Sequence, residues 1–555
     1  MNKKIKIFTA ILCIVAISGC TDGFEEMNKN PNAFEIGGIE PAGLIETLLL
    51  SSSNSLASDM TYYATEIAQV SSKSGNVREE QAYNLSGQDF LGRWNLFYGR
   101  ANIATHMKEL AEEQDDLNYQ AIGLIMKVYY MAQCTDLFGS IAYSEALKAS
   151  EQILKPRIES QQEVYTFMME DLEAANALID VNLVKPFVKA ERDRLYGGDM
   201  ARWKKFANTL HLRLLMRVSG RNDAFSPSVA QRIRTIIDNP DTYPIFTSNA
   251  DNAAVKFDAS ATYYRNNYNT ANIQNQNTFN DAKLSTVFLD LTVYNYDTGD
   301  CDPRLKIWGK PALQQARDYK WYGAIPAGNK DRASSEGSYW TMRHWETLVR
   351  DDNPNMLIDY AELLFIKAEA AFNGWIGGNA KDYYEAAVTA SCQYWNEFGK
   401  YARFPDQSGA TAPVNITAAD IAYMLTQPKS MYDGSLERIQ KQKWVSLFWV
   451  VGYEMYNEMR RTGYPDVALA SRIWINDRTN GQFIRRFGYP LIAIANNNAN
   501  YQEAILDQKG SVDRMSGMTL PVWWSGEAVA RDQGSPWPHA FRTPPYKYEE
   551  DIYEQ

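Results

Sequence analysis

Apolar residues recur at helical spacing through much of the chain, and the stretch 117–138 shows the pattern most regularly. One face of this stretch carries apolar side chains at the i, i+3, i+4 and i+7 positions expected of a buried helix face. These side chains are Ile122, Ile125, Met126, Tyr129 and Ala132. Gly139 follows directly, and we expect it to end the helix in a left-handed conformation.

Similar periodicity predicts helices in two further parts of the chain. The first part contains 40–75, 90–113, 199–219 and a helix that runs from a Ser160/Glu163 capping box to Leu172. The second part contains 355–373, 380–396 and 436–460, the last of which ends at Arg460-Arg461-Thr462-Gly463, a typical helix stop. Packed as antiparallel pairs, these helices predict a mostly α-helical scaffold over about 40–220 and 355–465.

The rest of the chain lacks helical periodicity. Residues 221–354 are punctuated by Pro, Asn and Asp, as in "DNPDTYP" and "RNNYNTANIQNQN", and residues 466–555 are also irregular. We therefore expect a single domain over 40–555, from which a loop-rich region at 221–354 projects. Within the scaffold, "LFIKAEAAFNGWIGGNAKDYYEAAVTA" resembles one tetratricopeptide unit, with small residues where its two helices cross.

The N-terminus has the features of an export signal. Lys3, Lys4 and Lys6 precede an apolar run of about 11 residues, which is shorter than the ~20 residues of a membrane-spanning helix. The run ends at Ile17-Ser18-Gly19-Cys20, which resembles the lipobox of bacterial lipoproteins, where the cysteine is acylated. This predicts a signal peptide at 1–19, lipidation at Cys20 and a leash at 20–39. An ordinary secretory signal is the alternative.

The charge and cysteine content of the chain argue against some classes of binding partner and against a disulfide-stabilised fold. The formal net charge of −11 argues against nucleic acid or an anionic membrane face. Cys13 leaves with the signal, and the scattered Cys134, Cys301 and Cys392 do not make a disulfide framework. The exported protein is therefore expected to be stable through its core alone, which a chain of this length can supply.

Signatures of common enzymes are absent from the sequence. It has no GxSxG, HExxH, GxxxxGK[ST] or GxGxxG motif. His106, His211, His344 and His539 lie far apart, without the spacing of metal ligands. A glycoside hydrolase is not excluded, because its carboxylate pair has no local signature among the 67 acidic residues.

One stretch offers a weak candidate metal site. "DTGDCDP" contains Asp297, Asp300 and Asp302, and calcium prefers oxygen ligands of this kind. The stretch lacks the glycine and the terminal glutamate of an EF-hand loop, so a polar turn is the favoured interpretation. We expect no cofactor.

Aromatic residues make up 13% of the chain, with 34 Tyr and 14 Trp, which is more than a core requires. In the loop-rich region they cluster with side-chain amides. This combination suits sugars, because flat rings cover C–H faces while amides and carboxylates bind hydroxyls. The candidate ligand residues are Tyr263, Tyr264, Asn266, Tyr268, Trp321, Tyr322, Tyr339 and Trp340, with Asn267, Asn269 and Trp345 nearby. A peptide would suit the same surface, and the rings equally suit a role in fastening long loops to the helices.

Several stretches, in order and over almost the whole chain, resemble the SusD/RagB family of nutrient-binding outer-membrane lipoproteins. They are "CTDGFEEMNKNPN" (20–32), "AIGLIMKVYYMAQCTDLFGSIAYSEAL" (121–147), "LKPRIESQQEVYTFMMEDLEAA" (154–175), "YGGDMARWKKFANTLHLRLLMRV" (196–218), "DPRL" (302–305), "NPNMLIDYAELLFIKAEAAFNGW" (353–375), "QKWVSLFWVVGYEMYNEMRRTGYP" (442–465) and "VWW" (522–524). At Ser140-Ile141-Ala142 the chain lacks a proline that many relatives carry, which leaves the shape of that turn open.

The resemblance implies a fold of four tetratricopeptide-like helix pairs with an irregular ligand-binding subdomain. It also implies a surface-exposed, lipid-anchored binding protein without enzymatic activity, which delivers oligosaccharide or peptide to a SusC-like TonB-dependent transporter. Asp22, Glu25 and Glu26 resemble the acidic export signal of such lipoproteins, or simply form a charged leash. The excess of Tyr, Trp and Asn favours a glycan over a peptide. A surface glycoside hydrolase and a purely structural adaptor are the alternatives from other classes.

Overall fold

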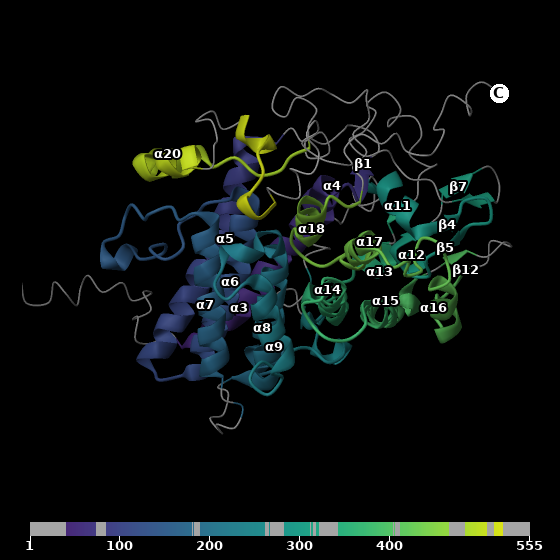
Figure 1. Ribbon diagram of the computed structural model, residues 1–555, viewed down its shortest axis with the longest axis horizontal. Helices are drawn as coiled ribbons and strands as arrows, with labels where there is room; N and C mark the ends of the chain where they lie inside the picture. Colours follow the sequence, from purple (N-terminus) through teal and green to yellow (C-terminus); the bar gives the residue numbers. More distant parts are fainter. Residues whose placement is uncertain are drawn as a thin grey trace, which may run out of the picture.

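The structure of the protein is a computed structural model. It describes residues 40–73, 85–179, 181, 189–260, 266, 282–310, 312–314, 318–320, 342–343, 345–402, 404–405, 411–465, 483–507 and 516–525. Long helices gather on one side of the molecule, and the later helices and short strands lie beside them (Figure 1).

The first group of helices forms the longer side. It contains α3 (Pro41–Asp59), α5 (Gly87–Glu113), α6 (Leu117–Phe138), α7 (Gln161–Leu178), α8 (Met200–Arg217) and α9 (Val229–Asp238). Helix α5 packs on α3 and α6, α6 packs on α7, and α7 packs on α8. Helix α6 is buried along almost its whole length, because it lies between neighbours in the centre of this group.

The second group follows later in the chain. It contains α11 (Thr286–Thr292), α12 (Leu305–Trp308), α13 (Trp345–Leu348), α14 (Tyr360–Phe372), α15 (Ala380–Asn396), α16 (Ala418–Met424), α17 (Leu436–Ser446) and α18 (Glu454–Thr462). The last helices, α19 (Leu491–Asn496) and α20 (Asn498–Asp507), return to the first group, where Tyr501 of α20 contacts Trp94 of α5 with ring centres 6.2 Å apart (Figure 1). Helix α14 packs on α15, α17 and α8, and so joins the two groups. The pairs α5/α6, α7/α8, α14/α15 and α17/α18 are consecutive helices in contact, and the predicted mostly α-helical fold is confirmed.

Short strands fasten the loops between the helices. β1 (Ser71–Lys73), β3 (Ala282–Leu284), β9 (Met342–Arg343) and β6 (Gly309–Lys310) form one antiparallel sheet in that order. The two-stranded pairs are β2 (Ala253–Val255) with β10 (Asn355–Ile358), β4 (Val293–Asn295) with β5 (Asp300–Cys301), β7 (Ala312–Gln314) with β8 (Asp318–Lys320), and β11 (Phe404–Pro405) with β12 (Thr411–Ala412).

Several helix ends follow their sequence signals. Ser160 and Glu163 form the predicted capping box at the start of α7: the Ser160 N–H donates to the Glu163 carboxylate at 2.9 Å, and the Glu163 N–H donates to Ser160 Oγ at 3.3 Å. Helix α18 ends at the predicted stop, where Gly463 is left-handed with φ 79° and ψ 7°. The prediction for Gly139 is wrong in detail, because its ψ of −124° lies outside the left-handed helical region although its φ is 84°.

Two predicted helices are shorter than their apolar pattern. The stretch 40–75 contains α3, a π-helical turn at Met60–Ala64, α4 (Thr65–Ile67) and then strand β1, which pairs with β3. The stretch 355–373 begins as strand β10, and helix α14 starts only after Asp359. Pairing with a distant strand decides both departures, and sequence periodicity does not reveal such a partner.

The predicted helix over 436–460 is two helices. Helix α17 ends at Ser446 and α18 begins at Glu454. Between them Trp449 and Gly452 have positive φ angles of 68° and 104°, and the Val451 N–H donates to the Met356 carbonyl of β10 at 2.8 Å. The positive φ of Gly452 favours glycine here, and a Cβ on this residue would lie 2.3 Å from the Gln133 side-chain oxygen.

The region predicted to be loop-rich, residues 221–354, contains helices that the sequence pattern did not predict. Helix α9 buries Val229, Ile233 and Ile236 on one face and starts with a capping box between Ser228 and Gln231. Its periodicity is regular but only ten residues long, and flanking Pro, Asn and Asp residues obscured it. Among the described helices, none has the length and apolarity that crossing a bilayer requires.

Candidate functional site

Most of the predicted ligand residues lie outside the described part of the chain. These are Tyr263, Tyr264, Tyr268, Trp321, Tyr322, Tyr339 and Trp340, together with Asn267 and Asn269. Their assignment stays a prediction. Trp345 begins α13.

Asn266 is described, and its surroundings do not support a role in ligand binding. Its side chain is 0% exposed, and its Nδ2 donates to the Asn353 carbonyl and to Asn355 Oδ1, both at 2.8 Å. Its backbone N–H donates to the Asp351 carbonyl at 2.8 Å. Asn266 therefore fastens its segment to the chain just before and at the start of β10. The sequence did not distinguish this buried amide from its asparagine neighbours.

Two neighbouring strands of the four-stranded sheet directly follow the two aromatic segments in the chain. Segment 267–281 leads into β3 and segment 321–341 leads into β9, and these strands are hydrogen-bonded neighbours with Lys283 opposite Met342. Standard strand spacing puts the first residues of the two strands on the order of 6 Å apart. Met342 also pairs with Lys310 of β6, which precedes the β7–β8 hairpin from which 321–341 departs.

Arg304 connects the loop-rich region to helices α15 and α17. Its guanidinium binds both oxygens of Asp302, at 2.6 Å through Nη2 and 3.1 Å through Nε. Nη1 donates to Ser391 Oγ of α15 at 2.8 Å, and Nη2 lies 3.3 Å from Gln442 Oε1 of α17. Arg304 and Asp302 are both fully buried. The arginine is therefore a structural centre where the loop-rich region meets two helices.

The candidate calcium site at Asp297, Asp300 and Asp302 is wrong. Asp302 is buried against Arg304, Asp300 accepts a hydrogen bond from the Tyr423 phenol at 2.6 Å, and Asp297 is exposed. Two of the three carboxylates are bound to different partners, so the three do not converge on one ion. The described residues contain no group of three or more His, Cys, Asp or Glu side chains that would hold a metal ion.

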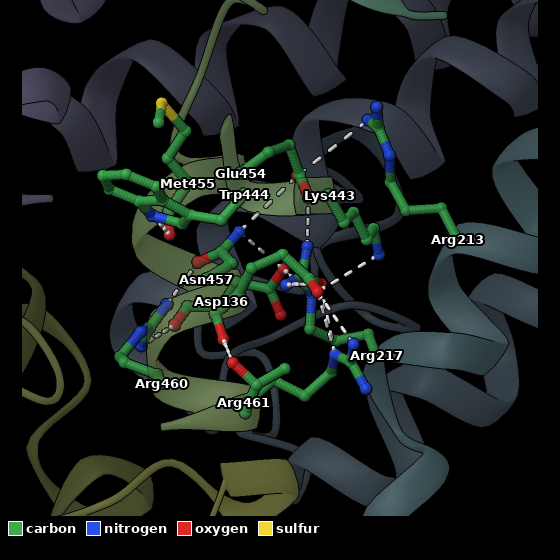
Figure 2. Close-up of polar contacts among 12 residues, drawn as sticks. Asp136, Arg213, Arg217, Lys443, Trp444, Glu454, Met455, Asn457, Arg460 and Arg461 are labelled. Atoms are coloured by element: carbon green, nitrogen blue, oxygen red, sulfur yellow. Dashed lines mark hydrogen bonds and ion pairs between the residues drawn. The ribbon is translucent and has the colours of Figure 1, made fainter. Parts of the chain in front are cut away.

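A cluster of buried ionic residues lies where helices α6, α8, α14, α17 and α18 meet (Figure 2). It contains Asp136, Arg213, Arg217, Glu362, Glu369, Lys443, Glu454, Glu458 and Arg461, all almost fully buried. The Glu458 carboxylate forms ion pairs with Arg461 at 2.8 Å, with Lys443 at 3.2 Å and with Arg217 at 3.3 Å. Burial alone would raise the pKa of Glu458, but these three cations hold it well below the usual range.

The same cluster links the two groups of helices. Arg213 of α8 binds Glu362 of α14, with Nε donating to Oε1 at 2.7 Å, and Arg461 of α18 binds Glu369 of α14 at 2.7 Å. Trp524 donates its indole N–H to Asp136 of α6 at 2.9 Å. Each of these carboxylates has a cation or a donor against it. The cluster is therefore suited to holding helices together, and it presents no open position for a substrate.

The thiols and the imidazole in the described core are held in unreactive forms. Burial raises the pKa values of Cys301 and Cys392 to about 12, and it raises that of Cys134 as well. Burial lowers the pKa of His211 to about 3, so its imidazole is neutral although Glu173 lies 3.6 Å from Nδ1. These groups do not form an activated nucleophile.

Asp359, which caps α14, gives a pH-dependent prediction. Its Oδ1 accepts the Glu362 N–H at 2.7 Å, and burial, reinforced by the Glu362 carboxylate, raises its pKa to about 7. The unfolded chain ionises this group near pH 4, so the folded protein loses stability as the pH rises from ~4 to ~7. Asp359→Asn keeps the cap and removes the charge. We expect this variant to gain stability relative to wild type across that window, measured by urea unfolding at several pH values.

The matched control is Asp199→Asn at the exposed cap of α8, where Asp199 accepts the Arg202 N–H at 3.2 Å. A gain of similar size in this variant would show that the effect is not specific to the buried cap. A constant difference between Asp359→Asn and wild type from pH 4 to 8 would contradict the assignment.

Comparisons with known proteins agree with this architecture. Residues 31–490 match a family described as "Starch-binding associating with outer membrane". A solved SusD homologue from Bacteroides fragilis has 25% identity to the chain, with a TM-score of 0.73 over 88% of this chain and 100% of its own. No curated protein matches the chain.

Two further structures share the fold. One is described as a chitin-binding protein, with 24% identity and a TM-score of 0.71 over 88% of this chain and 100% of its own. The other is a second SusD homologue from Bacteroides fragilis, with 23% identity and a TM-score of 0.69 over 88% of this chain and 99% of its own. At these identities the likeness establishes the fold alone.

Proposed function

Because this chain belongs to the SusD-like family, whose members are outer-membrane-associated binding proteins, we propose that it captures oligosaccharide at the cell surface and delivers it to a SusC-like TonB-dependent transporter. The match to the family over residues 31–490 is the observation that carries this proposal. Co-purification of such a transporter with the tagged protein from detergent extracts is the direct test of the partnership.

The proposal places the ligand on the segments 261–281 and 321–341. The two segments directly precede β3 and β9, which are neighbouring antiparallel strands of one sheet. Rings from both segments would then stack on the C–H faces of sugar residues, while amides bind hydroxyls. A peptide is the second candidate, because the same rings and amides suit a peptide backbone.

Single substitutions of the rings test the site. We expect Trp321→Ala, Trp340→Ala and Tyr264→Ala each to weaken binding by roughly 3- to 10-fold, since one stacked ring contributes about 0.5–1.5 kcal/mol. Calorimetry with the oligosaccharide selected from a glycan array measures this. Phe372→Ala is the control, because Phe372 is an exposed ring at the end of α14.

The outcomes separate the alternatives. Unchanged affinity in all three variants would remove the site assignment. Binding to a peptide library without binding to any glycan would favour the peptide. Reducing sugar released from starch or chitin oligosaccharide by the purified protein would instead favour a glycoside hydrolase.

We also propose that residues 1–19 are removed as a signal peptide and that acylation of Cys20, for instance with palmitate, tethers the protein to the outer membrane. Several acyl chains anchor a protein stably, because each buried methylene contributes about 0.8 kcal/mol. Labelled palmitate should be incorporated into wild type and not into Cys20→Ser. Equal labelling of the two proteins would refute the tether.

A further inference from the structure

An exposed tyrosine stands on the surface of the second group of helices. Tyr423 is 51% exposed, whereas Ile421 and Met424, its neighbours in α16, are buried. Helix α16 lies beside the β4–β5 hairpin at one end of the molecule (Figure 1). The helix therefore uses its apolar side for packing and turns this ring toward solvent.

The ring is fixed in place by the hairpin. Its phenol donates to Asp300 Oδ2 at 2.6 Å, and this hydrogen bond is the largest cause of the raised pKa of Tyr423. Asp300 is paired with Asn295 across the hairpin. A ring held by a hydrogen bond before a ligand arrives loses less side-chain entropy on binding than a mobile ring.

Lys429 in turn holds the hairpin. Its ammonium donates to the Val293 carbonyl at 2.7 Å and lies 5.6 Å from the centre of the Tyr296 ring. Tyr294 makes a further contact, with its hydroxyl 2.8 Å from Ser430 Oγ. The platform for Tyr423 is thus built from two chain segments more than a hundred residues apart.

Further polar groups lie on the hairpin that holds Asp300. Asn295 is exposed and uses only its side-chain oxygen on the hairpin, accepting the N–H groups of Asp297 and Thr298 at 2.8 Å and 3.1 Å. Asp297 is exposed beside it, and Asp300 is half-buried. An exposed ring bonded to one carboxylate, with an exposed amide opposite that carboxylate on the hairpin, suits the C–H face and the hydroxyls of a pyranose.

We propose that the surface formed by Tyr423, Asp300, Asn295 and Asp297 is a second sugar-binding surface, which contacts a polysaccharide in addition to the oligosaccharide site. The inference rests on the proposed glycan-binding function. A single ring within polar surroundings suits a sugar better than a protein partner, whose stable interface requires about 1,000 Å² or more. Two acids of "DTGDCDP", Asp297 and Asp300, are thereby given a role in binding hydroxyls.

A second sugar-binding surface helps a protein to retain a long polysaccharide. A long chain that touches two places on one protein is retained more strongly than either place alone retains it, because the second contact is intramolecular. A weak surface contact also lets the polymer go when the oligosaccharide is handed on.

Affinity electrophoresis in native gels containing soluble starch or glycol chitin tests the proposal with the full-length mature protein. We expect Tyr423→Ala to reduce retention in the gel that retards wild type, with an apparent affinity roughly 3- to 10-fold lower. Tyr423→Phe keeps the ring but loses the bond to Asp300, so its retention should fall less. The control is Tyr383→Ala, a half-buried tyrosine of α15 whose ring Lys367 covers.

Three results would contradict the second sugar-binding surface. Wild-type retention of Tyr423→Ala overturns the second surface and leaves the proposed function intact. Equal losses in Tyr423→Ala and Tyr383→Ala also overturn it, because the effect is then not local. If wild type is retained by neither polysaccharide and also binds no oligosaccharide, the proposed glycan function fails, and this inference fails with it. Circular dichroism confirms that each variant is folded.

Discussion

Glu458→Gln is expected to destabilise the protein by about 3–5 kcal/mol, the usual loss when one partner of a buried ion pair is removed. Glutamine keeps the shape of the side chain, but it withdraws the charge that faces Arg461, Lys443 and Arg217 at 2.8, 3.2 and 3.3 Å. These cations are almost fully buried, so water does not replace the lost carboxylate. Urea-induced unfolding monitored by tryptophan fluorescence measures the change.

The control for this variant makes the same change of charge on the surface. Glu437→Gln removes the partner of Lys441 at the i,i+4 position of α17, where the two side chains are 2.5 Å apart and solvent-accessible. Such pairs contribute only about 0.3–0.5 kcal/mol. Similar losses for Glu458→Gln and Glu437→Gln would show that the buried cluster stabilises the fold no more than a surface pair does.

Arg304→Met should produce the second large effect, again about 3–5 kcal/mol, because it leaves the Asp302 carboxylate buried without its cation. It also removes the contact with Ser391 of α15. We expect the double variant Asp302→Asn/Arg304→Met to recover part of the loss, since neither charge then remains. A double-mutant cycle by chemical denaturation measures the coupling.

Arg157→Met is the matched control for the arginine. Arg157 donates to Glu163 Oε1 at 2.8 Å, but its side chain is 49% exposed. Its removal should change stability by no more than about 1 kcal/mol. If the effects of Asp302→Asn and Arg304→Met on the free energy of unfolding are additive, the two side chains are not coupled. The loop-rich region then does not depend on this ion pair.

Local signals in the sequence predicted much of the scaffold correctly. The boundaries of α6 and α15 agree with the predicted 117–138 and 380–396, and the stop at Gly463 and the capping box at Ser160 both form. These features depend on residues that lie three to seven positions apart in the chain. Local sequence patterns are therefore enough to predict them.

Other features depend on contacts between distant residues. Arg217 and Glu458 are 241 positions apart, and Tyr423 and Asp300 are 123 apart. The break between α17 and α18 depends on a backbone contact with β10, and the burial of Asn266 depends on Asn353 and Asn355. Periodicity contains no information on any of these pairings.

The sequence by itself thus determined the helical class of this protein, the ends of several of its helices, and the family to which it belongs. Only the tertiary structure decided which charges are buried together, which acid binds an arginine instead of an ion, and which tyrosine stands in solvent. The physical reason is that helix formation is largely a local equilibrium of the backbone. The environment of a polar or aromatic side chain is instead set by partners that folding brings from elsewhere in the chain.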